Sequence, residues 1–87
     1  MHLREGRQVN ENRLRKCFTE ALGLPAVDLT DDLTYATRPQ WDSIAHMSLV
    51  AALETEFDVM LETEDILGMN SYGEARSILS RYGVTFP

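Results

Sequence analysis

Three side chains in the segment Asp42-Ser43-Ile44-Ala45-His46 have the chemistry for a functional site. An aspartate directly before a periodic apolar run is a good N-cap, because its carboxylate accepts from the free N–H groups of the first helical turn. With Asp42 as the cap, the Ser43 hydroxyl is not needed there and stands exposed at the positive end of the helix, a suitable place to attach a phosphate group. Ser, His and Asp are also the residue types of a hydrolytic triad, but consecutive turns of one helix do not build that geometry.

The alternative for Ser43 is an ordinary helix start without chemistry, since Ser and Asp are common there. Ser71 offers an internal comparison. With Glu74 three residues later, it has the spacing of a capping box, in which reciprocal bonds occupy the serine hydroxyl. Ser43 is followed at that distance by His46, so we expect its hydroxyl to be free. The residues alone leave both roles open.

Three helical patterns must position these residues, and no segment has a convincing strand pattern. The first covers residues 10–22, with Asn10 as its cap and Gly23 directly after its end. The second covers residues 43–57, and its wide apolar stripe predicts a central helix contacted on more than one side. The third covers residues 71–82, and residues 62–67 are expected to form a short helical turn before it.

The connection between residues 23 and 41 is long for a compact domain, and such loops tend to be functional or to contain an element of their own. Pro39 stops any helix before Gln40, so we expect the chain to reach Asp42 in extended form. Several apolar side chains are expected to pin this loop to the helices: Leu24, Val27, Leu29, Leu33 and Tyr35.

Composition and charge fit one small globular domain. The chain has 87 residues, of which 44% are hydrophobic and 25% charged. Residues 23–87 hold three arginines against eleven acids, which argues against a nucleic-acid partner because phosphate binding needs the opposite sign. A basic partner surface would complement this acidity, although it also fits a plain solvated face. No apolar run reaches the roughly 18 residues of a membrane span, and the N-terminus lacks the apolar core of a secretory signal.

The single cysteine and the two histidines give little sign of chemistry. Cys17 lies at an apolar helical position, which predicts a buried thiol and fits a reducing compartment, so we expect a cytoplasmic protein. His2 and His46 lie far apart, with no Cys or His partner at ligand spacing, so we expect no metal site. His46 is expected to be a surface or packing residue, or part of a partner contact.

A short motif and a later helix ending resemble one family. The sequence Trp-Asp-Ser-Ile at residues 41–44 resembles the Asp-Ser-Leu attachment motif of acyl carrier proteins. Ile44 replaces the usual leucine, and Gln40 stands where many members have glycine. Ala-Leu-Glu-Thr-Glu-Phe at residues 52–57 is similar to the end of the family's second helix, and the resemblance covers about residues 10–82.

The resemblance implies an all-α fold, a small four-helix bundle with a long first loop and a short third helix. Residues 10–87 would form the acyl carrier domain, and residues 1–9 an N-terminal extension. It also implies that Ser43 carries covalent 4′-phosphopantetheine, with Asp42 as the flanking helix cap.

The same resemblance implies partners. A phosphopantetheinyl transferase would modify the chain, and acyl-loading and acyl-transfer enzymes would visit it, so the chain itself would not be an enzyme. We expect a monomer. Two alternatives remain: an aminoacyl or peptidyl carrier with the same prosthetic group, and an unmodified acidic helical adaptor that binds a basic partner.

The second helix differs from that of carriers serving the housekeeping fatty-acid synthase, which typically presents several acids just after the serine. At the matching places this chain has neutral side chains: Ala45, Ser48, Ala51 and Thr55. Glu54 and Glu56 are kept only near the helix end. We therefore expect a dedicated carrier for a specialised acylation, fatty-acid or polyketide-like pathway, with Ile44, Met47 and Glu54 as partner-binding residues.

Overall fold

The computed structural model describes residues 3–87, with side chains described from Gly6 onward, so His2 lies outside it. It contains four α-helices and one 3-10 helix: α1 (Leu3–Leu22), η1 (Ala26–Asp28), α2 (Ser43–Phe57), α3 (Thr63–Gly68) and α4 (Tyr72–Arg81). Residues 3–87 contain no strand, only an isolated bridge between Thr34 and Ser71. The predicted all-α fold is confirmed.

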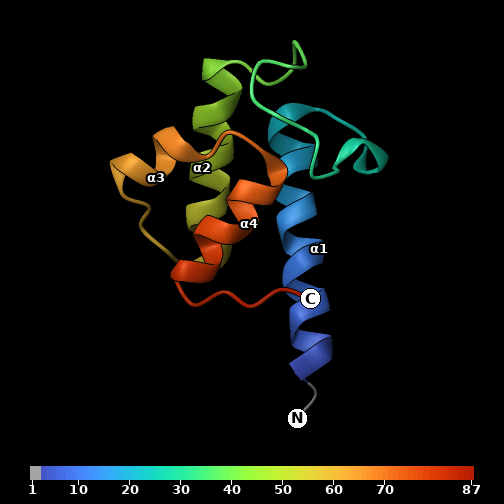
Figure 1. Cartoon of the computed structure of the whole chain (residues 1–87), viewed down its shortest axis with the longest axis vertical. Coiled ribbons are helices and arrows are strands. Elements are labelled where there is room, and N and C mark those ends of the chain that lie inside the picture. Colours follow the sequence, from blue (N-terminus) through green and yellow to red (C-terminus); the bar gives the residue numbers. More distant parts are fainter. Residues whose placement is uncertain (1–2) are drawn as a thin grey trace.

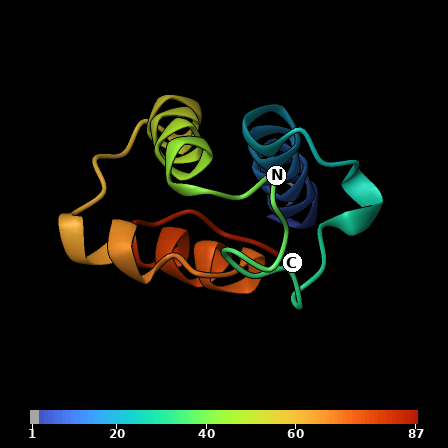
Figure 2. The ribbon, with the colours of Figure 1, turned by 90° about the horizontal axis from the view of Figure 1, so that it is seen from above.

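The helices form two layers. α1 and α2 lie side by side in one layer, and α3 and α4 lie across them in the other (Figures 1 and 2). The core lies between the layers, where Phe18 of α1, Leu53 of α2 and Leu79 of α4 are fully buried. Each such side chain contributes roughly 1.5–3 kcal/mol through burial. None of the helices described is both long and apolar enough to cross a membrane.

The first helix begins earlier than the sequence indicated. α1 starts at Leu3, so the expectation that Asn10 caps it is wrong. Residues 3–9 contain no proline and mostly favour helix, so nothing stops the helix there. Asn10 instead lies within α1, and its side-chain amide donates to the Thr85 carbonyl at 3.0 Å. At the other end, Gly23 adopts φ +69° and donates to the Thr19 carbonyl, which confirms it as the terminating residue.

α1 also buries a charged residue. Glu11 is only 5% exposed, and its carboxylate accepts from the Tyr72 hydroxyl at 2.5 Å and from the Arg76 guanidinium at 3.1 and 3.2 Å. Burial by itself raises the pKa of Glu11, but these hydrogen bonds and the charges of Arg76 and Arg15 outweigh it and hold that pKa below its ordinary value. The cluster ties α1 to α4.

The long loop is held to the core by some of its expected anchors. Leu24, Leu29 and Leu33 are buried. Val27 is 81% exposed, so the expectation that it pins the loop is wrong, because the single turn of η1 buries none of its residues. η1 itself confirms that the loop contains an element of its own.

The last helix is capped as expected, but the capping box is only half formed. The Ser71 hydroxyl accepts the Glu74 N–H at 2.9 Å. No return bond from Ser71 N–H to the Glu74 carboxylate occurs among the described residues, so the prediction of reciprocal bonds is wrong. Backbone bonds on either side of Ser71, from Tyr35 N–H to Asn70 and from Tyr72 N–H to Leu33, hold this segment instead.

Cys17 is a buried thiol, as predicted. It is 3% exposed, and its Sγ lies 3.7 Å from the Ala52 carbonyl oxygen. Burial, together with the nearby carboxylates of Glu56 and Glu20, raises the pKa of the Cys17 thiol to about 11. The thiol is therefore protonated near neutral pH and is a core side chain, not a nucleophile.

Candidate functional site

α2 begins at Ser43, and Asp42 caps it as predicted. The Asp42 backbone is extended, with φ −105° and ψ −174°, and its carboxylate accepts the Ala45 N–H at 2.8 Å. Ser43 is exposed, and no other residue in the described part of the chain hydrogen bonds to its hydroxyl. The cap thus leaves the Ser43 hydroxyl accessible and unengaged.

The start of α2 also offers free backbone donors. The His46 N–H binds the Asp42 carbonyl at 2.8 Å, whereas the N–H groups of Ser43 and Ile44 have no acceptor within residues 3–87. No acidic residue occupies the first turn of the helix. Free N–H groups and the helix dipole favour an anion at this place. The residues present therefore fit a phosphodiester on the Ser43 oxygen.

Trp41 anchors the chain immediately before the cap. Its side chain is fully buried, and its ring meets the rings of Phe18 and Tyr35 edge-on, with centroids 5.6 and 6.1 Å apart. Its indole N–H donates to Nδ1 of His46 at 3.0 Å. Replacing a buried tryptophan of this kind with alanine lowers the free energy of unfolding by about 3–5 kcal/mol. The core thus fixes the position from which Asp42 and Ser43 extend.

A groove of about 300 Å³ opens beside Ser43, between α2 and α3. Its lining is mostly apolar and comes from the loop and both helices: Tyr35, Ser43, His46, Met47, Ile66, Leu67 and Asn70. Met47 and Leu67 are 56% and 73% exposed, and Ile44 in the first turn of α2 is 78% exposed. Exposed apolar side chains that gather in one place are typical of an interaction surface.

The three predicted partner-binding residues lie in different surroundings. Ile44 and Met47 are exposed near Ser43. The wide apolar stripe of α2 predicted a helix contacted on more than one side, but the part of the stripe at the start of α2 is left uncovered. Glu54 lies near the end of α2, half-buried, and accepts the Leu61 N–H at 2.9 Å. Its role toward partners stays a prediction.

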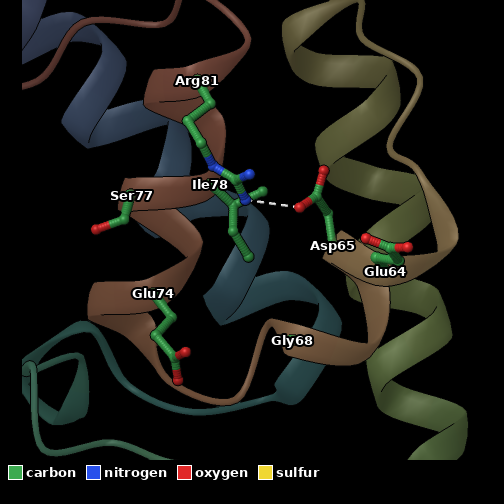
Figure 3. Close-up of a pocket in the computed structure, with 7 residues that line it drawn as sticks. All are labelled: Glu64, Asp65, Gly68, Glu74, Ser77, Ile78 and Arg81. Carbon is green, nitrogen blue, oxygen red and sulfur yellow. Dashed lines mark hydrogen bonds and ion pairs between the residues drawn. The ribbon is translucent and has the colours of Figure 1, made fainter.

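A second hollow, of about 370 Å³, lies between α3 and α4, and its lining combines charged and polar side chains with Ile78 (Figure 3). Arg81 donates to Asp65 at 2.6 Å, and the Tyr82 hydroxyl donates to the other oxygen of the same carboxylate at 2.5 Å. The hydrogen bond from Tyr82 has the larger effect and that from Arg81 the smaller, and together they lower the pKa of Asp65. The hollow is larger than the groove, but its arginine, Arg81, pairs with Asp65, and none of the predicted site residues lines it. We interpret it as a structural junction.

Sequence reasoning did not find several residues of the groove. Ile66 and Leu67 lie more than 20 residues after Ser43, and Tyr35 lies in the irregular loop before it, so no helical period connects these residues with Ser43. His46 lies one helical turn after Ser43, and that spacing alone placed it near the site. Within residues 3–87, no three His, Cys, Asp or Glu side chains are grouped closely enough to hold a metal ion.

The cap can be tested directly. Replacing Asp42 with alanine is expected to lower the free energy of unfolding by about 1 kcal/mol, because the Ala45 N–H loses its acceptor. Urea denaturation measures the change, and Asp32→Ala is the matched control, since Asp32 is exposed in the loop before α2. Equal stabilities of the two variants would show that Asp42 is not the cap.

Comparison with known proteins agrees with this geometry. Residues 12–75 match the family model described as the phosphopantetheine attachment site. That range runs from α1 into α4 and includes the start of α2. No solved structure gives a significant match. Because the match spans well over half of the chain, the protein belongs to the phosphopantetheine-attachment family, the carrier domains that bear covalent 4′-phosphopantetheine.

Proposed function

We propose that this chain is an acyl carrier protein and that Ser43 is the residue to which 4′-phosphopantetheine is joined. The observation that carries the proposal is the exposed Ser43 hydroxyl at the start of α2, left free because Asp42 provides the cap. When attached, the group supplies a terminal thiol that holds acyl groups as thioesters. Catalysis then belongs to a phosphopantetheinyl transferase and to acyl-loading and acyl-transfer enzymes.

The residues around Ser43 have separate tasks. The backbone N–H groups of Ser43 and Ile44 favour the phosphodiester charge. The groove, with Met47 and Leu67 in its lining, offers an apolar surface to cargo. Apolar lining favours an acyl chain over a charged aminoacyl group, because burying a charge without a partner is costly. This supports an acyl carrier over an aminoacyl or peptidyl carrier.

The experiment is intact-mass measurement of the unmodified chain after incubation with coenzyme A and a broad-specificity transferase. We expect the mass of a single phosphopantetheine to be added. No added mass would exclude a carrier and favour the acidic adaptor. Loading with acyl and aminoacyl thioesters then separates the two carriers: an acyl chain should shift the NMR signals of Met47 and Leu67, and an aminoacyl group should not. The reverse pattern would favour the aminoacyl carrier.

We also propose a dedicated carrier in a specialised acylation, fatty-acid or polyketide-like pathway, acting as a cytoplasmic monomer. The two acids of α2, Glu54 and Glu56, support a specialised role, because each carboxylate already binds another part of this chain. Glu54 accepts from Leu61, and Glu56 forms an ion pair with Arg13 at 2.8 Å. Partners are then left with the apolar side chains of Ile44 and Met47 near the serine, and Glu54 contributes charge only at the helix end.

Docking of this kind predicts salt tolerance. Raising the salt concentration from about 0.05 to 0.5 M shortens the Debye length severalfold and weakens exposed ion pairs, but it leaves apolar contacts intact. We expect the KM of the cognate enzyme for this carrier to change less than about twofold, and Ile44→Ala to raise it more than Ser48→Ala does. Efficient turnover by general fatty-acid elongation enzymes, at the rate of a housekeeping carrier, would contradict the specialised role.

A further inference from the structure

His46 joins three elements at the groove. Its Nδ1 lies 3.0 Å from Nε1 of Trp41, and its Nε2 lies 2.9 Å from the carbonyl oxygen of Ile66. The imidazole is also nearly parallel to the Trp41 indole, with an interplanar angle of 22° and centroids 6.1 Å apart, and it meets the Tyr35 ring edge-on at 5.6 Å. One side chain of α2 therefore contacts the loop before Ser43 and the backbone of α3.

These partners indicate which tautomer of the ring fits the site. The Trp41 indole N–H can only donate, so Nδ1 of His46 must accept and carries no proton. The Ile66 carbonyl can only accept, so Nε2 must carry the proton and donate. The neutral Nε2–H tautomer is the one form that satisfies both bonds. The position requires an acceptor and a donor on the same side chain.

α3 depends on such contacts. It has six residues and buries none of them fully, and a helix this short is not stable alone. Toward α4 it is held by Asp65, which binds Arg81 and Tyr82. Toward α2, the bond from His46 to Ile66 is the one hydrogen bond found in the described part of the chain.

We propose that His46 is the latch that holds α3 against the start of α2 and sets the width of the groove beside Ser43. His46 and Ile66 both line the groove, so α3 cannot move away from α2 without breaking the bond between them. Release would also leave the Nε2–H of His46 and the carbonyl of Ile66 without each other as partners. His46 is thus a positioning residue. That it limits the cargo admitted rests on the proposed function, whereas the latch itself does not.

The test compares two substitutions on the unmodified chain. His46→Gln keeps an acceptor and a donor at a similar separation, whereas His46→Leu removes both. Met47→Leu is the control, because Met47 lines the same groove and makes no side-chain hydrogen bond in residues 3–87. Hydrogen exchange is followed at the Trp41 indole N–H and the Ile66 amide, with the Ala75 amide of α4 as reference.

We expect His46→Leu to speed exchange at Trp41 and Ile66 about tenfold or more, with Ala75 unchanged, because local opening becomes easier when hydrogen bonds are lost. His46→Gln and Met47→Leu should stay close to the wild-type rates. Unchanged exchange in His46→Leu would overturn the latch. The latch would also be overturned if both His46→Leu and His46→Gln speed exchange at Trp41, Ile66 and Ala75 alike. That result would show that His46 only fills space in the core. If His46→Leu fails to fold, His46→Asn, too short to reach both partners, replaces it.

The cargo part of the proposal has its own readout. In carriers loaded with thioesters of increasing chain length, His46→Leu should shift the best protection from hydrolysis toward longer chains, while His46→Gln should not. An unchanged chain-length profile would overturn the role in cargo selection. Exchange in the unmodified chain does not depend on Ser43, and modification of every variant is measured separately by mass. Failure of the latch and failure of the carrier function are therefore distinguishable.

Discussion

The Ser43→Ala variant is expected to gain no phosphopantetheine while it folds as the wild type does. The substitution removes the one oxygen to which the phosphodiester would be joined. It leaves the cap intact, because Asp42 and not Ser43 accepts the Ala45 N–H. The free energy of unfolding should therefore change by less than about 0.5 kcal/mol. Intact mass after incubation with coenzyme A and transferase, together with urea denaturation, measures both effects.

Two other serines serve as controls for this result. Ser48 is exposed on the same helix, so Ser48→Ala should be modified like the wild type. Ser71 caps α4 through Glu74, so Ser71→Ala should lose about 1 kcal/mol of stability and keep the modification. If Ser43→Ala still gains mass, the attachment site lies elsewhere, although the chain remains a carrier.

The second large effect is expected at Glu11. Glu11→Gln should lower the free energy of unfolding by about 2–3 kcal/mol near neutral pH, because hydrogen bonds to a charged group are worth that much. The change leaves Arg76 without its buried carboxylate and weakens the bond from Tyr72. Thermal or urea unfolding measures it, and Glu20→Gln, at an exposed position of the same helix, is the matched control.

The effect of Glu11 should depend on pH with a definite sign. Its pKa in the folded state lies below the ordinary value of 4.5, so the stability it contributes is complete above that value. That contribution is lost as the pH falls through the lower folded pKa. Glutamine does not titrate, so the gap between wild type and Glu11→Gln should narrow on acidification below about 4.5. A gap that stays constant with pH would show that the charge of Glu11 is not what stabilises the fold.

The sequence predicted what depends on neighbouring residues. The start of α2 follows from an aspartate before a periodic apolar run, and the end of α1 follows from Gly23, whose positive φ suits glycine. The early start of α1 was missed because asparagine favours the cap position over the helix interior. In the folded chain Asn10 lies inside α1, and its side chain instead binds the Thr85 carbonyl, a contact between residues 75 positions apart.

Contacts between residues far apart in the chain could not be predicted from the sequence. His46 and Ile66 are 20 residues apart, and Glu11 and Arg76 are 65 apart, so no local period relates them. Glu11 did carry a signal, because it lies three and seven residues before Leu14 and Phe18, on the buried side of α1. An acid on that stripe predicts a buried partner of opposite charge, without saying which one.

The first and last residues that the structure describes, Leu3 and Pro87, belong to segments that lie away from the start of α2 (Figure 1). α1 begins at the opposite end of the long axis, and the segment after α4 runs back against α1, where Thr85 binds Asn10 (Figure 1). A tag, a solid support or a neighbouring domain fused to either terminus would therefore sit behind the carrier. Ser43 would still face outward, so the protein can be tethered from either end without shielding it from visiting enzymes.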